Sequence, residues 1–98
     1  MITDNIFLET DLKRQLKHMS IDSGVHVSTM LIEEAERVVN VDYPIKELYN
    51  NADYDTFTMK VDPEFKEQVR QFCEERDVSF KKFWNTVALN VVNDSEEY

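Results

Sequence analysis

The side chains best suited to chemistry are two histidines and one cysteine, and their spacing predicts no reactive centre. His18 and Asp22 stand four residues apart on one face of an expected helix, with His26 close behind. A metal site can be drawn from these three, but no second group of ligands accompanies them. Cys73 falls in a helical apolar pattern and is expected to border the core. With no glycine-rich phosphate loop either, we expect no enzymatic activity, no metal and no cofactor.

The elements that would position functional residues repeat along the chain. An offset of 53 positions brings the apolar residues of the two halves into register, for example Leu12 with Phe65. Few residues are identical, so it is the pattern of buried positions that repeats. Two short copies in one chain usually complete a shared core. We therefore predict one folded domain with units over 1–40 and 56–98, joined by a connector over 41–55 with room for a short helix.

The second copy has the clearer element signals. Thr56–Val61 alternates strictly between polar and apolar residues, which is typical of a half-buried strand. Asp62 and Pro63 suit the N-cap and first position of a following helix. Ser79 suits the N-cap of a second helix, whose apolar stripe is so broad that it must be mostly buried.

The first copy repeats this order with weaker signals. Asp4–Leu8 is a poor strand by propensity and places Asp4 at an inward-facing position. Thr10 and Asp11 would open a helix that closes near Gly24, the only glycine of the chain. A final helix is expected from about Val27 to Val39.

Composition narrows the class of protein. The chain has one glycine and two prolines, which favours helix over a many-turned β architecture. No apolar run approaches membrane-spanning length, and the N-terminus lacks the layout of a signal peptide. One cysteine fits a reducing compartment, so we expect a cytoplasmic protein. The net charge of −9 is spread evenly along the sequence and is unusual for a protein held to nucleic acid by counterion release.

The repeated pattern resembles the ribbon-helix-helix family of Arc- and MetJ-like repressors. The residues that carry the resemblance are the strand Thr56–Val61, the turn Asp62-Pro63-Glu64, and Val78-Ser79 ahead of Phe83-Trp84. The resemblance implies a mainly α fold of two tandem β-α-α ribbon-helix-helix units. Their strands would pair antiparallel, and the four helices would form one intertwined core, as a single-chain pseudo-dimer.

The same resemblance implies a sequence-specific DNA-binding transcriptional regulator, a repressor, from a phage or plasmid. Its partner would be the major groove of double-stranded DNA, with molecules able to assemble side by side on longer sites. The implied base-reading residues are Thr56, Thr58, Lys60, Thr3, Asn5 and Phe7. The implied phosphate-binding residues, at the starts of the second helix of each unit, are Ser79, Lys81, Lys82, Ser28 and Thr29.

A second interpretation stays open, in which the same scaffold is an acidic protein-interaction module. It would hold a protein partner as an antitoxin does, or act as an antagonist or DNA mimic. Its acidic clusters would be Glu33, Glu34 and Glu36, and Glu74, Glu75 and Asp77. Its aromatic contacts would be Phe7, Tyr43, Tyr49 and Tyr54.

Overall fold

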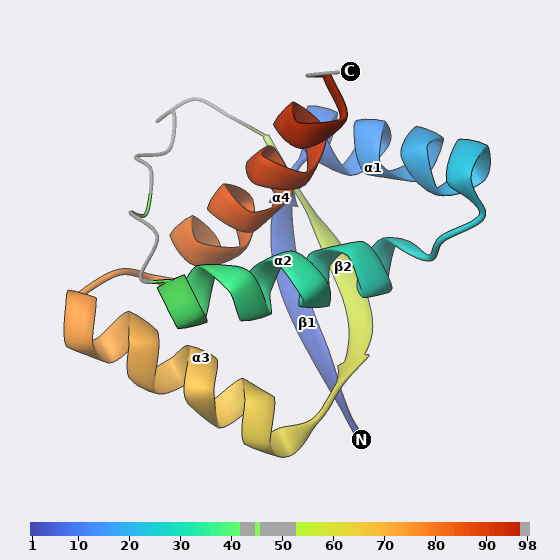
Figure 1. The fold of residues 1–98 in the computed structure, drawn as a ribbon. Coiled ribbons are helices and arrows are strands. Elements are labelled where there is room, and N and C mark those ends of the chain that lie inside the picture. Colours follow the sequence, from blue (N-terminus) through green and yellow to red (C-terminus); the bar gives the residue numbers. More distant parts are fainter. Residues whose placement is uncertain (42–44, 46–52, 97–98) are drawn as a thin grey trace.

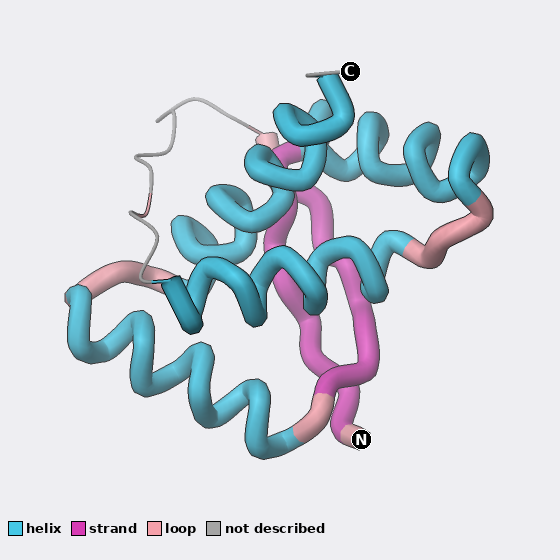
Figure 2. The backbone as a smooth tube through the Cα atoms, in the orientation of Figure 1, coloured by secondary structure: helices cyan, strands magenta, loops and turns pink. Residues whose placement is uncertain are grey.

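A narrow two-stranded sheet and helices on one side of it form the fold. The computed structural model describes residues 1–41, 45 and 53–96 of the chain. In chain order the elements are β1 (Ile2–Glu9), α1 (Thr10–Ser23), α2 (Val27–Val41), β2 (Tyr54–Val61), α3 (Pro63–Arg76) and α4 (Phe80–Glu96). In Figure 1 and Figure 2, α2 and α4 cross in front of the paired strands, with α1 and α3 to either side.

The two strands pair antiparallel over their whole length, with Asn5 opposite Thr58 near the middle. Because side chains alternate along a strand, each strand has one face toward the helices and one face away from them. The face toward the helices carries the buried residues Ile6, Leu8, Met59 and Val61. Both strands are longer than the sequence predicts, and the alternation expected for Thr56–Val61 is confirmed.

One inward-facing position of β1 is charged, and the structure shows how it is accommodated. Asp4 lies opposite Met59 in the register of the sheet. Its carboxylate is 3.6 Å from Nζ of Lys66 on α3, and its side chain keeps 18% of its surface exposed. The carboxylate therefore has both a counter-charge and access to water, so β1 forms despite a poor local propensity.

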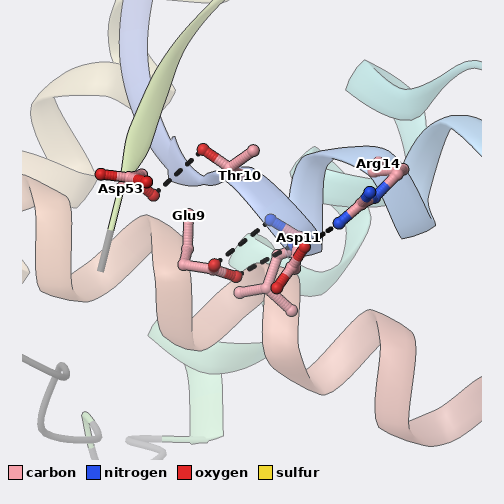
Figure 3. A network of polar contacts seen from close by, with 6 residues as sticks. Glu9, Thr10, Asp11, Arg14 and Asp53 are labelled. Carbon is pink, nitrogen blue, oxygen red and sulfur yellow. Dashed lines mark hydrogen bonds and ion pairs between the residues drawn. The ribbon is translucent and has the colours of Figure 1, made fainter. Parts of the chain in front are cut away.

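The helices that follow the strands begin at acidic N-caps. Asp62 accepts a hydrogen bond from the backbone N–H of Glu64 at 2.9 Å, and Pro63 opens α3 as predicted. The N-cap of α1 is Glu9, one residue earlier than the predicted start. Its carboxylate accepts from two backbone N–H groups of the first turn of α1, as Figure 3 shows.

The same helices end in left-handed residues. Gly24 closes α1 with φ of 74°, a conformation that glycine adopts without steric cost. Asp77 closes α3 with φ of 53°, and its N–H returns to the carbonyl groups of the last turn. Each chain reversal lets the following helix, α2 or α4, turn back across the sheet.

The core lies between the sheet and the pair α2 and α4. Phe83 is fully buried, and its ring meets those of Phe72 and Trp84 edge-on, with centroids 5.6 and 5.1 Å apart. From α2, Leu31 and Val38 are also fully buried. The broad apolar stripe predicted for the last helix is mostly buried and forms the largest part of the core, except that Phe80 at its start is exposed.

The predicted fold class is wrong. Instead of two tandem ribbon-helix-helix units, the described residues form one two-stranded antiparallel sheet and four helices, in the order β-α-α-β-α-α. The element order and antiparallel pairing agree with the prediction, but the halves are unequal. α1 buries only Leu16, whereas α3 buries four residues. Leu12 and Met19 stand where α3 has Phe65 and Phe72, and these smaller side chains stay partly exposed because they do not reach as far into the core.

Two further predictions concern the connector and membrane-spanning segments. The predicted short helix of the connector falls mostly on residues 42–44 and 46–52, outside the described residues, while Ile45 packs partly buried against the core. Across 1–41 and 53–96, no helix has the length and apolar character needed to cross a membrane.

Candidate nucleic-acid interface

The sheet face turned away from the helices brings together every residue predicted to read bases. Successive outward positions of the antiparallel strands face each other in pairs, because the side chains of a strand repeat every second residue. The pairs are Thr3 with Lys60, Asn5 with Thr58, and Phe7 with Thr56. All six side chains are exposed. The face thus presents hydroxyls, an amide, an ammonium and one aromatic ring on a backbone held by the sheet.

The central pair is joined by a side-chain hydrogen bond. The hydroxyl of Thr58 donates to Oδ1 of Asn5 at 2.7 Å. One lone pair of that carbonyl oxygen is therefore used, and the amide keeps its two N–H donors and its other lone pair for further partners. Asn5 is held in place by Thr58 and is richer in donors than in acceptors.

The start of α4 is fixed to β1 through one buried amide, Asn85. Its Oδ1 accepts from the backbone N–H of Glu9 at 2.7 Å, and its Nδ2 donates to the carbonyl oxygen of Phe7 at 2.9 Å. The same nitrogen lies 2.7 Å from the carbonyl oxygen of Lys81. Only 2% of Asn85 is exposed, so the link is shielded from water. The hydrogen bonds of Asn85 therefore fix the position of the α4 N-terminus relative to β1 and to the outer face of the sheet.

The residues predicted to bind phosphate lie at the starts of α4 and α2. The hydroxyl of Ser79 accepts from the backbone N–H of Lys82 at 3.1 Å, which confirms Ser79 as the cap. Lys81 is exposed, and its Nζ lies 3.7 Å from the centroid of the Tyr54 ring, beside the sheet. In the first turn of α2, which contacts β2, Ser28 is half-buried and Thr29 exposed.

Two lysines beside the sheet were missed by sequence reasoning. Lys13 Nζ donates to the carbonyl oxygen of Thr56 at 3.0 Å, and Lys66 pairs with Asp4 on the other strand. A signal was present, since the two lysines are related by the same offset that aligns the apolar residues. Each ammonium has three donors, so a contact to the sheet does not exhaust its capacity.

The arginines are used differently from these lysines. Each of the four pairs with a carboxylate of its own helix, namely Arg14 with Asp11, Arg37 with Glu34, Arg70 with Glu67 and Glu74, and Arg76 with Glu75. Hydrogen bonding to Arg70 lowers the pKa of Glu67, and the two carboxylates raise the pKa of Arg70. Three of the paired carboxylates, Glu34, Glu74 and Glu75, belong to the acidic clusters that the alternative interpretation assigns to a protein partner.

A hollow of about 240 Å³ lies beside β1, where α3 and α4 begin. Its walls include the aromatic rings of Phe7, Phe80 and Trp84, and two lysines, Lys66 and Lys81, stand at it. Phe7 and Phe80 are about half exposed, at 52% and 48%. Asp4 also lines the hollow, and its carboxylate pairs with Lys66, so Lys81 is the ammonium there that could meet a phosphate beside apolar surface.

The histidines and the cysteine lie apart from this surface. His18 and His26 are exposed, and the described residues contain no group of three metal-ligating side chains. Cys73 is buried in the core with 3% of its surface exposed. Burial raises the pKa of its thiol to about 11, so the thiol stays protonated at neutral pH.

The chain was compared with protein-family models, with curated proteins and with solved structures. No family model, curated protein or solved structure matches it. The geometry of the outer sheet face and its lysines is therefore the basis on which a function can be argued.

Proposed function

We propose that this protein is a sequence-specific DNA-binding transcriptional regulator that inserts its two-stranded sheet into the major groove. The observation that carries the proposal is the outer face of the sheet, where six exposed side chains stand in facing pairs on a fixed backbone. The major groove admits a two-stranded ribbon, and each base pair presents a distinct pattern of donors and acceptors there.

The residue types on this face suit base edges. Lys60 can donate to O6 and N7 of guanine, and the threonines can either donate or accept. Asn5, with one lone pair taken by Thr58, is best suited to acceptors such as N7 and O6. Phe7 can contact the methyl group of thymine.

Charge around the face supports the same function, although the whole chain carries −9. None of the six proposed reading residues is acidic, and one is a lysine. The next outward position of β1 is Glu9, whose carboxylate accepts hydrogen bonds from the first turn of α1. Lys13, Lys66 and Lys81 contact the strands from the neighbouring helices. The local field at a binding face decides association more than the sum of charges does. We therefore expect weak binding to random DNA and steep weakening with salt.

Selection from a pool of random DNA duplexes at low salt tests the proposal. The wild-type protein should enrich a consensus, and Lys60→Ala should lose part of it. Arg70→Gln is a matched control, because it removes one positive charge that Glu67 and Glu74 already engage. Failure of the wild type to enrich any sequence, at any salt concentration, would reject DNA reading. Equal effects of Lys60→Ala and Arg70→Gln would reject the sheet face as the reading surface.

A further inference from the structure

The outer face of the sheet has a local two-fold relation centred on Asn5 and Thr58. These two residues face each other in the register, and their separation of 53 positions is the offset that aligns the apolar residues of the two halves. A half-turn about this pair places Thr3 on Thr56 and Phe7 on Lys60. In a symmetric pair of strands, such related positions would carry the same residue and would read the same base.

The two ends of the face differ in chemistry under this relation. At one end Lys60 faces Thr3, which combines an ammonium with a hydroxyl. At the other end Phe7 faces Thr56, which combines an aromatic ring with a hydroxyl. Phe7 is 52% exposed, so the ring is a contact surface and not part of the core. One end is therefore built to donate to base acceptors and the other to meet an apolar group.

The positively charged side chains beside the two ends of the face also differ. At the Phe7 end, Lys81 stacks on Tyr54, and Lys13 donates to the carbonyl oxygen of Thr56. The equivalent position to Lys81 at the start of α2 is Ser28, which has no charge. Lys66, the counterpart of Lys13, pairs with Asp4 beside the Lys60 end. The Phe7 end therefore has one more cation at its rim, Lys81, whereas the Lys60 end has a cation in the proposed reading face itself.

We propose that the protein recognises a DNA site without two-fold symmetry, and that one chain binds it in one orientation. Guanine lies at the Lys60 end of the site, and thymine lies at the Phe7 end. Symmetric dimers read palindromic sites because the protein symmetry is repeated in the DNA. Here the two related positions carry a donor and an apolar ring, so a palindrome would satisfy only one end. This inference rests on the proposed function and specifies its substrate.

Two symmetrising variants test the inference. Phe7→Lys gives both ends a lysine, and Lys60→Phe gives both ends a phenylalanine. Both positions are exposed, and unchanged helical circular dichroism would verify that each variant folds. Three duplexes are compared: the selected consensus, a palindrome made from its Lys60-end half, and a palindrome made from its Phe7-end half.

The wild type should bind its consensus on the order of tenfold more tightly than either palindrome. Phe7→Lys should prefer the palindrome of the Lys60-end half, and Lys60→Phe should prefer the other. A wild-type consensus that is itself palindromic overturns the inference and leaves the proposed function standing, as do variants whose preference among the three duplexes is unchanged. Absence of any enriched sequence overturns the proposed function and this inference with it.

Discussion

The hydroxyl of Thr58 donates a hydrogen bond to the amide oxygen of Asn5, 2.7 Å away on the facing strand. The two residues are opposite each other in the register and both are exposed. A side chain that is fixed before binding loses less conformational entropy when it meets a base. The pair therefore orients the Asn5 amide at the centre of the proposed reading face.

Thr58→Val should lower base discrimination at the centre of the site while leaving the fold intact. Valine keeps the β-branched shape that suits a strand but removes the donor that orients Asn5. We expect discrimination to fall about fivefold, which corresponds to about 1 kcal/mol for one neutral hydrogen bond. Binding to four duplexes that differ at the central base pair measures this. Thr56→Val is the control, and an equal loss of central discrimination in it would contradict a specific role for the pair.

The buried amide of Asn85 should be required for stability. Leucine has a similar size, but it would leave the N–H of Glu9 and the carbonyl oxygen of Phe7 without the partners that Asn85 supplies. Unpaired buried polar groups are costly, so Asn85→Leu should lower the free energy of unfolding by about 2–3 kcal/mol. Urea denaturation measures the change. Asn93→Ala, at an exposed position of α4, should stay within about 0.5 kcal/mol of wild type.

Some elements of the fold could be predicted from the sequence, and others could not. The strong signals predicted the alternation of β2, the caps Asp62 and Ser79, and the glycine that ends α1. Local chemistry determines such features. The fold class could not be predicted, because core depth depends on how far each side chain reaches, and the shorter side chains of α1 leave the two halves unequal.

The candidate site likewise has features that the sequence predicts and features that it does not. Outward strand positions follow from alternation, so the six exposed positions could be named in advance, while the base-reading role proposed for them came from the family resemblance. The contacts of Asn85 with β1 and of Lys13 with β2 join residues 76 and 43 positions apart, and no local pattern specifies such pairs. The alternation places a charge, Asp4, at an inward position, but its pairing with Lys66 depends on where α3 packs.

Replacing Asp4 with an apolar residue should stabilise the protein. Its ion pair with Lys66 is long, at 3.6 Å, and Lys66 is 44% exposed, so the pair contributes little. Leucine at this position would add apolar surface opposite Met59. Asp4→Leu should raise the free energy of unfolding by about 1 kcal/mol. Asp4→Asn removes the charge without adding apolar surface, so a similar gain in that variant would attribute the effect to charge alone.

The thiol of Cys73 should make stability depend on alkaline pH. Burial raises its pKa from 9.0 to about 11 in the folded protein. Between these values the unfolded chain releases the thiol proton while the folded chain retains it, so stability falls as pH rises from 9 to 11. The loss should approach roughly 2 kcal/mol. Urea denaturation across this range, compared with Cys73→Ala, isolates the contribution because lysines and tyrosines titrate in both proteins. Identical pH profiles would show that the thiol does not contribute.

Lys81 and Lys82 should contribute to DNA affinity without contributing to sequence preference. Both are in the first turn of α4, and the Lys81 ammonium lies over the Tyr54 ring at the edge of the sheet, where phosphates would pass. Lys81→Ala combined with Lys82→Ala should weaken binding to all duplexes by a similar factor. Because each phosphate contact releases counterions, the slope of log K against log salt should become shallower by roughly 2. Arg14→Gln combined with Arg70→Gln removes the same charge from side chains that are paired within their helices, and it should leave the slope nearly unchanged. An equal flattening in both double variants would mean that total charge, and not the position of these two lysines, sets the salt dependence.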